Sequence, residues 1–574
     1  MQGYQYTFIY RSKDDIIPPY ATHLRFHDYF RGDITGVYIP PHITHLYFGW
    51  CHNQPTTIPE HIICVCFDSL KYNQPTVFPN GIKHISFYTG FNQPTIIPSS
   101  VEDISFGKDY NQPTTLPEGI KHVTFGDHFN QPITIPSSVK SLKFGDHFNS
   151  NIVFEPHCNI NHLTFGREFN QSVHLPSSIE HLTFGQCFNK ILELPSNISK
   201  LEFGCCYNQP TVLPEGLTSI KFGNNYNQQY TVLPTSLTHL YFGVQFNQFI
   251  NLTTNITHLE FGHYYNKPLT IPVSVVSVTF GHTYNQHTVL PCGVKRVIFG
   301  ARYNRKTLFP SSITDVQFGY YYNQPTYLPV SVTRVKFGYR FDRYITLPEG
   351  IKHVTFGTCF NKRFNIPSSV KSLIFGECYN QVTDFTATRN LKRLEFGKYY
   401  NQVTKLQPYS NIEYLKFGDE YNQKTSLPFN IKKLTFGKAY NMPTTFPSSI
   451  VSLTFGNDYH QSDYDQSDLL PPLIQFLRFG KGFTKMVQLP PNLRHFNVYA
   501  GNVEFNNFYR DEVKKLRNIT YFNISGDRVG LHCETNMHNY RCKTKTLLDL
   551  CLGRYQYLGD GYNGGLHAYV GHIL

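Results

Sequence analysis

Residues 139–149 read VKSLKFGDHFN, and residues 131–136 just before them read QPITIP. The Phe-Gly dipeptide at the centre of this stretch returns along most of the chain. Between Phe48 and Phe479 we count 23 copies, two of them with another residue in place of Gly, and 16 of the 22 intervals are 19 residues long. Self-similarity at such a period predicts a solenoid, in which each copy forms one turn stacked on the last.

Five apolar columns emerge when the copies are aligned on the Phe. In the copy above they hold Ile135, Val139, Leu142, Phe144 and Phe148. Leu142 and Phe144 are two residues apart, which predicts a short strand with both side chains turned inward, ended by the Gly. About 19 residues cannot also hold a helix of roughly 11 residues. We therefore expect a β-rich solenoid with one long parallel sheet, an irregular outer side and capped ends, roughly 110 Å long if neighbouring strands lie about 4.8 Å apart.

A polar column follows five residues after the Phe. From Asn130 to His460 it holds Asn in every copy except the two that have Asp342 and His460. A buried Asn must be hydrogen-bonded, and a stacked row of Asn amides can serve backbone groups of adjacent turns. The alternative is an exposed Asn that a turn favours, but turn preference alone would also admit Asp, Gly and Ser. We therefore predict an asparagine ladder that belongs with the core.

The repeat resembles a known family. The run Leu-x-Phe-Gly-x-x-[Phe/Tyr]-Asn-Gln-Pro-x-x-x-[Leu/Ile]-Pro-x-Ser is similar to the FNIP repeat, a relative of the leucine-rich repeat, over residues 40–495. The resemblance implies a leucine-rich-repeat-like solenoid used for protein binding, in a family seen mostly in amoebae and in the large DNA viruses that infect them. Family members often carry an N-terminal F-box that couples the repeats to ubiquitin ligation. Residues 1–41 are few and rich in Tyr, Pro and Gly, so we expect no F-box there.

The repeat boundaries divide the chain into three parts of one elongated domain. Residues 1–41 are expected to form an N-terminal cap and a degenerate first rung, and residues 42–495 the FNIP-type solenoid. Residues 496–574 are expected to hold degenerate rungs and a C-terminal cap, since open sheet ends must be covered.

Two segments near the C-terminal end interrupt the regular pattern. The acidic segment 461–468 lengthens one interval, and it is either a recognition loop or a tolerated insertion. Residues 493–496 and 519–524 look like degenerate rungs, and residues 510–517 between them predict a short helix.

Composition and charge narrow the function classes. The chain has 48 Phe and 41 Tyr, which fill the core columns and therefore do not indicate stacking on bases. The net charge of +12 fits a solvated basic surface or weak attraction to acidic partners. Neither an apolar leader nor a run of 18 apolar residues is present, so we expect an intracellular location, in the cytoplasm (of the host, if viral), and no membrane span.

The residues three and one before each Phe should point out of the sheet and form a polar, variable face. Solenoids commonly bind partners on such extended surfaces, although a merely solvated sheet face is the alternative. On this face the C-terminal half is basic, with only Asp315 and Glu395 as acidic residues in the same two columns. The candidate partner-binding residues are Arg296, Arg334, Lys336, Arg393, Lys416, Lys433, His162, His181, His239 and His258.

The histidines form two pairs, His162 with His181 and His239 with His258, on adjacent strands. A metal site would need further ligands that the sequence does not offer, so we expect no metal and no other cofactor. A mild pH response is the better prediction, because close imidazoles resist double protonation.

Catalytic signatures are missing from the sequence. It contains no Gly-rich phosphate loop, no nucleophile elbow and no HExxH motif. A nucleic-acid-binding repeat would need exposed aromatic or Arg planes in register, whereas the registered aromatics here belong to the core. We therefore predict a monomeric, non-catalytic scaffold that binds a protein partner, one with an acidic surface, through the exposed sheet face. The alternatives are the substrate-recognition part of a ubiquitin-ligase adaptor and, less favoured, a nucleic-acid-binding repeat protein.

Overall fold

The computed structural model describes residues 6–12, 14–34, 36–229, 231–459, 470–499 and 501–525. The chain falls into two compact units, which span residues 1–431 (unit 1) and 432–574 (unit 2). Within the described ranges, no helix combines the length and the apolar character that crossing a membrane requires. The acidic segment 461–468 and the tail from residue 526 lie outside the described residues, so the predictions made for them stay predictions.

Unit 1 is a stack of turns, each of which contributes one short strand to a parallel sheet, as the Leu-x-Phe step predicts. The sheet strands of unit 1 are β1 (Thr7–Tyr10), β2 (His23–Phe26), β3 (His45–Phe48), β5 (Cys64–Phe67), β7 (His84–Phe87), β8 (Asp103–Ser105), β9 (His122–Thr124), β11 (Ser141–Lys143), β13 (His162–Thr164), β14 (His181–Thr183), β15 (Lys200–Glu202), β16 (Ser219–Lys221), β17 (His239–Tyr241), β18 (His258–Glu260), β19 (Ser277–Thr279), β20 (Arg296–Ile298), β21 (Asp315–Gln317), β22 (Arg334–Lys336), β23 (His353–Thr355), β24 (Ser372–Ile374), β25 (Arg393–Glu395) and β26 (Tyr414–Lys416).

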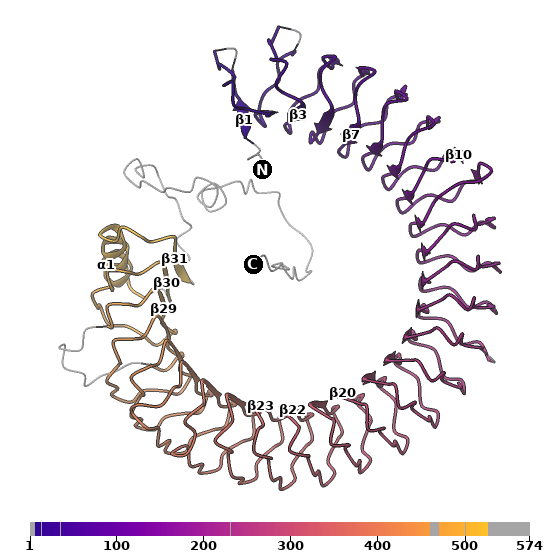
Figure 1. Ribbon diagram of the computed structural model, residues 1–574. Coiled ribbons are helices and arrows are strands. Elements are labelled where there is room, and N and C mark those ends of the chain that lie inside the picture. Colours follow the sequence, from indigo (N-terminus) through magenta and orange to yellow (C-terminus); the bar gives the residue numbers. More distant parts are fainter. Residues whose placement is uncertain are drawn as a thin grey trace. The chain divides into compact units, whose positions relative to one another are not determined.

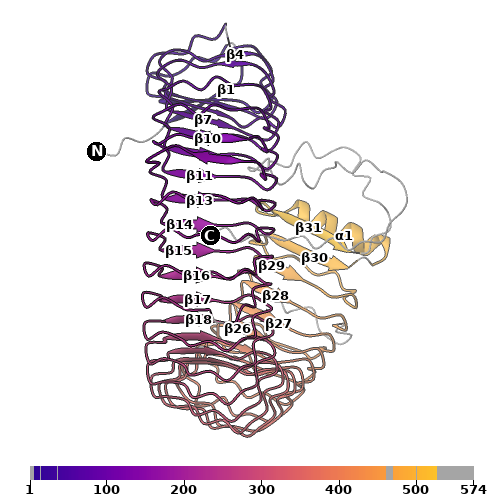
Figure 2. The ribbon, with the colours of Figure 1, turned by 90° about the vertical axis from the view of Figure 1, so that its right-hand side faces the viewer.

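The strands of unit 1 pair in parallel with an unbroken register. His162 stands opposite His181, and Leu163 opposite Leu182, so each repeat column becomes a row across the sheet. The stack of unit 1 bends, with these strands on its concave side and the return segments on its convex side (Figure 1). In the view turned by 90° about the vertical axis, strands β11 to β18 lie one beneath another (Figure 2). Unit 1 is therefore curved, a feature that strand spacing alone does not predict, because the return segments diverge from one another more than the strands do.

The outer side of the turns is irregular or extended, as 19-residue copies predict. Short parallel pairs occur there at two places. Strand β4 (Thr56–Thr57) pairs with β6 (Thr76–Val77), and β10 (Ile133–Ile135) pairs with β12 (Ile152–Phe154). The described residues form about 25 turns. The Phe-Gly count of 23 is lower because β1 and β2 lie before its first copy, where Tyr10 and Phe26 are not followed by Gly, and because the strands at 495–499 and 521–525 lie after its last copy.

The described residues of unit 2 form the same kind of turn and one helix. Its strands are β27 (Lys433–Thr435), β28 (Ser452–Thr454), β29 (Phe476–Arg478), β30 (His495–Tyr499) and β31 (Tyr521–Ser525), and its helix is α1 (Val503–Lys514).

The last two strands of unit 2 match the segments that the sequence identifies as degenerate rungs. Strands β30 and β31 pair in parallel. The helix predicted over 510–517 begins earlier, at Val503, because Asn502 caps it: its side-chain oxygen accepts a hydrogen bond from the Phe505 N–H at 2.8 Å.

The core of unit 1 consists of the predicted apolar columns. Leu142, Phe144 and Phe148 are at most 1% exposed, whereas Lys143 between them is exposed. The rings of Phe144 and Phe148 stack at 3.8 Å within one turn, and Phe144 and Phe165 lie 5.8 Å apart between turns. Two continuous aromatic rows therefore run through the stack, and they account for the high content of Phe and Tyr.

The asparagine ladder is present. The Asn149 N–H donates to Oδ1 of Asn130 on the preceding turn at 2.8 Å, and later turns repeat this bond. The prediction that these side chains are buried is wrong, because Asn149 is half-buried and Asn130 is exposed. The ladder lies at the corner where the chain leaves the sheet, so it joins turns at the margin of the core.

The Gly that follows the repeat Phe allows the turns to approach closely. A Cβ on Gly145 would lie 2.3 Å from the carbonyl oxygen of Gly126, and a Cβ on Gly126 would lie 2.0 Å from that of Gly107. Real Cβ atoms do not approach backbone so closely, so this column needs Gly for packing as well as for ending the strand.

Candidate protein-binding face

The outward-pointing side chains of the unit 1 strands form the sheet face. They stand three residues and one residue before each repeat Phe and lie on the concave side of unit 1. Strand β22 is a clear example, since Arg334 and Lys336 are exposed on either side of Val335, which is 1% exposed. The period-two alternation that buries the core thus also builds this face, with two outward side chains for every turn.

The two histidine pairs lie together on the sheet face, as their spacing predicts. The ring centroids of His162 and His181 are 4.3 Å apart, edge to face, and those of His239 and His258 are 4.4 Å apart and stacked. Burial lowers the pKa of His181, and the neighbouring His162 and Lys200 lower it further.

The second pair behaves in the same way. Burial lowers the pKa of His239, followed by His258 and Lys200. Both causes favour the neutral imidazole, which agrees with the expected reluctance of close rings to protonate together.

Part of the basic stretch on the sheet face is paired with carboxylates. The Arg296 guanidinium lies 3.9 Å from Asp315 on the next strand. Arg393 donates from Nε to Oε1 of Glu395 at 2.6 Å, and it also lies over the Tyr414 ring at 4.5 Å. Arg296 and Arg393 therefore each lie beside a carboxylate, which offsets part of their positive charge.

The remaining basic candidates divide between the two units. Arg334 and Lys336 lie on β22 and Lys416 lies on β26, all three exposed and, among the described residues, outside any ion pair. Lys433 is exposed on β27 and belongs to unit 2. The structure therefore brings Arg296, Arg334, Lys336, Arg393 and Lys416 onto one sheet face of unit 1, and Lys433 belongs to a separate unit.

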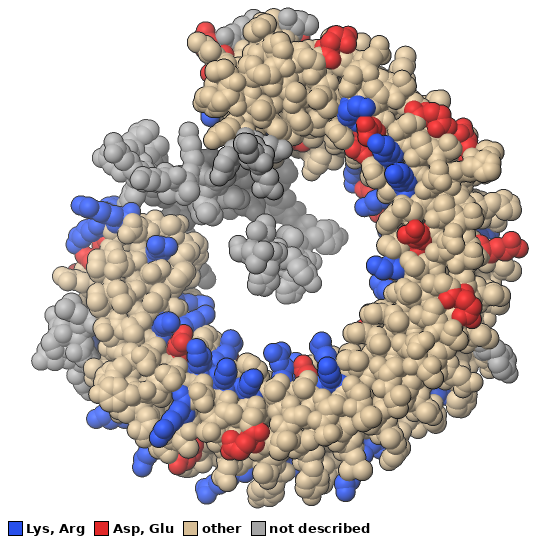
Figure 3. Space-filling model, viewed as in Figure 1, with Lys and Arg blue, Asp and Glu red and all other residues tan. Residues whose placement is uncertain are grey.

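Sequence reasoning missed a third column on this side, four residues before each repeat Phe. Lys352 and Lys371 occupy it on consecutive turns, and both are exposed. The pKa of His353 is lowered by burial and then by Arg334, Lys371 and Lys352, so all three cations lie close to that imidazole. Figure 3 shows Lys and Arg side chains gathered along the lower inner edge, where Figure 1 places β20 to β23. The 19-residue period could have found this column, because Lys352 and Lys371 stand one position before the outward column that lies three residues before each Phe.

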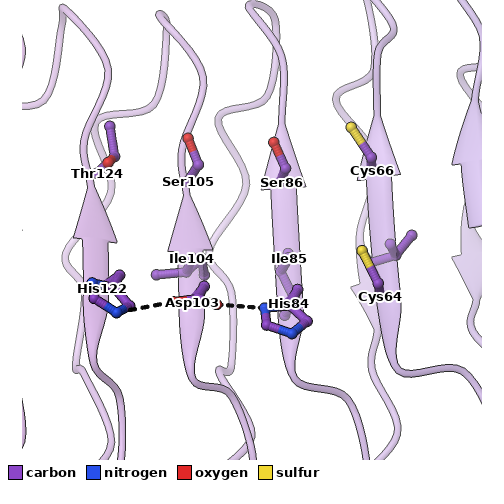
Figure 4. A pocket seen from close by; sticks show the side chains of 11 residues that line it. Cys64, Cys66, His84, Ile85, Ser86, Asp103, Ile104, Ser105, His122 and Thr124 are labelled. Carbon is purple, nitrogen blue, oxygen red and sulfur yellow. Dashed lines mark ion pairs between the residues drawn. The ribbon is translucent and has the colours of Figure 1, made fainter. Parts of the chain in front are cut away.

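A shallow pocket of about 290 Å³ lies at the N-terminal end of the sheet face. In Figure 4, Asp103 stands between two histidines, 2.5 Å from Nδ1 of His84 and 3.9 Å from Nε2 of His122. Cys64 and Cys66 stand beside them on β5.

The chemistry of these thiols argues against a nucleophile or a metal ligand, both of which need a thiolate. Burial, followed by a hydrogen bond to Asp68, raises the pKa of Cys66 to about 12, and burial raises the pKa of Cys64. In the part of the chain that the structure describes, no group of three or more His, Cys, Asp or Glu side chains is arranged to hold a metal ion.

Comparison with known families identifies one whose model matches the chain, the FNIP Repeat. The matches together cover more than half of the chain. They span residues 72–109, 110–147, 130–155, 158–187, 169–206, 207–245, 246–283, 303–340, 322–359, 341–378 and 423–458. No curated protein matches the chain.

Comparison with solved structures finds leucine-rich-repeat proteins. The crystal structure of CroV588, described as a novel circular LRR protein structure, is 28% identical with a TM-score of 0.65, and the match covers 88% of this chain and 96% of that one. YopM from Yersinia enterocolitica WA-314 is 14% identical with a TM-score of 0.42, over 80% of this chain and 91% of that one.

Proposed function

Since this chain belongs to the FNIP repeat family, a solenoid fold that generally serves as a protein-interaction scaffold, we propose that it binds a protein partner through the sheet face of unit 1 and catalyses no reaction. The ubiquitin-ligase and nucleic-acid alternatives have no comparable support among the described residues.

The observation that carries this proposal is the contrast between the two sides of each strand. Across β14, β15 and β16 the inward residues are Leu182, Leu201 and Ile220, all at most 3% exposed. The outward residues in the same rows change from His to Lys to Ser. A constant core holds this variable polar face at a fixed spacing, which is how solenoids present extended recognition surfaces.

The groups that line the pocket of the sheet face also favour recognition over catalysis as a proposal. This pocket is shallow and open, and burial raises the pKa of the Cys64 and Cys66 thiols that line it. Recognition needs only complementary charge and hydrogen bonding spread over several turns, which this face offers.

Photo-crosslinking from defined positions tests the proposal. A photoreactive amino acid would replace the outward residues Thr183 or Thr279 on the sheet face, or the exposed Lys306 or Lys405 on return segments. We expect proteins crosslinked in the native cell, identified by mass spectrometry, from the sheet-face positions and not from the return segments. Crosslinks that form only from Lys306 and Lys405 would place the binding surface on the other side and contradict the proposal.

A further inference from the structure

Four cations gather on, or directly before, three consecutive strands of the sheet face. We define the β22–β24 cluster as Arg334, Lys336, Lys352 and Lys371, arranged around His353. In the paired register Arg334 stands opposite His353, and His353 stands opposite Ser372. Neighbouring parallel strands lie about 4.8 Å apart, so the backbone positions of the cluster fall within roughly 10 Å across the strands.

The cluster brings four cations together with no carboxylate in its own columns, and the nearest carboxylate in register is Asp315 on β21, opposite Arg334. On β22 to β24 the residues four, three and one before the Phe are Thr, Arg, Lys, then Lys, His, Thr, then Lys, Ser, Ile. Several cations in these columns elsewhere are compensated: Lys83 and Lys121 both pair with Glu102, and Lys392 pairs with Glu413 at 3.6 Å. Among the described residues, the four cations of the cluster form no ion pair.

Like charges held this close disfavour one another, and a protein normally intersperses them with carboxylates. The effect is visible at His353, whose pKa is lowered by burial and then by Arg334, Lys371 and Lys352. An arriving anion would relieve this repulsion, so the cluster gains more from a negatively charged ligand than the paired cations nearby do.

We propose that the β22–β24 cluster binds an acidic, extended segment of the protein partner through its carboxylates. This inference rests on the proposed function, since it names the chemistry of what docks on the same face. Alternate side chains of an extended chain project to one side at roughly 6.6–6.8 Å. The long side chains of Lys352 and Lys371 can adjust to that spacing, while the guanidinium of Arg334 can hold a carboxylate with two parallel hydrogen bonds.

An acidic polypeptide fits this site better than a nucleic acid does. Single-stranded nucleic acids bind through aromatic side chains on which the bases stack. The outward columns of β22 to β24 contain no Phe, Tyr or Trp, and they offer Thr355 and Ile374 as uncharged, non-aromatic neighbours instead. The site supplies charge without stacking surfaces, which suits carboxylates on a flexible backbone.

The test uses the full chain and a fluorescein-labelled peptide of ten glutamates, with binding followed by fluorescence anisotropy at low salt. The double variant R334E/K336E reverses two cluster cations. The matched control K306E/K405E makes the same change in net charge at exposed positions on return segments. We expect the glutamate peptide to bind the native chain, R334E/K336E to weaken binding by at least about tenfold, and the control to bind as the native chain does.

Two further measurements keep the result interpretable. Circular dichroism and thermal melting show whether R334E/K336E is folded, and the milder variant K352Q/K371Q replaces it if it is not. In the native chain, the imidazole resonances of His353 should titrate at higher pH once the peptide is bound, because carboxylates then offset Arg334, Lys371 and Lys352.

Three outcomes overturn the inference: no binding of the glutamate peptide to the native chain, equal binding by the folded cluster variants, or tighter binding of a ten-nucleotide oligothymidylate that depends on Arg334 and Lys336. The last outcome would make the cluster a nucleic-acid site. If the peptide fails while crosslinks from Thr183 and Thr279 persist, the acidic-segment inference is wrong and the protein-binding proposal stands.

Discussion

The backbone N–H of Asn285 donates a hydrogen bond to Oδ1 of Asn266 on the preceding turn at 2.9 Å. Oδ1 of Asn285 in turn accepts from the N–H of Asn304 at 3.0 Å. Each side chain therefore satisfies a backbone donor of the following turn. The bond joins turns at a corner that the sheet hydrogen bonds do not reach.

Replacing Asn285 with Ala should lower stability, because the Asn304 N–H then loses its acceptor. The expected loss is about 1 kcal/mol, at the low end for an unpaired donor because the site is half-buried. The thermal unfolding midpoint measures it. Asn285→Asp should behave like the native chain, since Asp342 already fills this role in another turn, where its Oδ1 accepts from the Asn361 N–H at 2.9 Å. Equal losses for Asn285→Ala and for the exposed Asn251→Ala, whose side chain has no hydrogen-bond partner among the described residues, would contradict a stabilising ladder.

Replacing Gly281 with Ala should destabilise unit 1 more strongly. The new Cβ would lie 1.6 Å from the carbonyl oxygen of Gly262, so the two turns must separate. Overpacking of this kind costs about 1–3 kcal/mol. The matched variant Gly36→Ala meets no atom within 4 Å and should leave the urea midpoint unchanged. A Gly281→Ala chain that unfolds at the native urea concentration would show that the turns can shift without cost.

Replacing Tyr265 with Phe should raise stability, whereas Tyr284→Phe should lower it. The Tyr265 hydroxyl is buried and has no hydrogen-bond partner among the described residues, because Leu269 stands where the next turn has Thr288. The Tyr284 hydroxyl lies 2.9 Å from Oγ1 of Thr288. Each substitution is expected to change the free energy of unfolding by about 1 kcal/mol, in opposite directions. The shift of the melting midpoint shows the direction of each change. Shifts of the same sign would refute this account of the two hydroxyls.

Acidification should destabilise the N-terminal turns through His52. This residue is fully buried, with Nε2 2.9 Å from Oγ1 of Thr56, and burial, opposed only by Asp33, lowers its pKa from 6.5 to about 4. The unfolded chain then binds a proton between pH 6.5 and 4 that the folded chain does not, so stability falls as the pH drops through this window. His52→Phe should remove about 3 kcal/mol of that loss by pH 4.

The matched variant for this prediction is His287→Phe, which changes the same residue type at an exposed position. It should keep the native loss of stability on acidification. Chemical unfolding at pH 7 and pH 4 measures both variants. If His52→Phe loses as much stability as the native chain between these values, the pH dependence originates elsewhere.

Much of the fold could be predicted from the sequence because it repeats. Period-two spacing placed Leu142 and Phe144 inside and Lys143 outside, and the Asn column predicted a real ladder. What escaped prediction depends on distances between turns. The close approach that requires Gly145, the exposure of Asn130 and the bend of unit 1 follow from how return segments pack, which no single copy encodes.

The candidate face was predicted in outline, and its charge balance was not. The sequence placed Arg296 and Arg393 on the same face as Arg334, but only the structure shows the first two beside carboxylates. Lys352 and Lys371 were missed because strict alternation turns their position inward, whereas the chain bends there before the strand begins.

The asparagine bond between turns does not depend on the length of the segment that separates its partners. Asn170 donates to Asn149 at 2.9 Å across a 21-residue interval, and Asn189 donates to Asn170 at the same distance across 19 residues. If recombination between similar copies added or removed a turn, the turns on either side could therefore still form the same asparagine hydrogen bond. The coding sequence can lengthen or shorten the sheet face one turn at a time, so the reach of this surface can evolve separately from the chemistry of each turn.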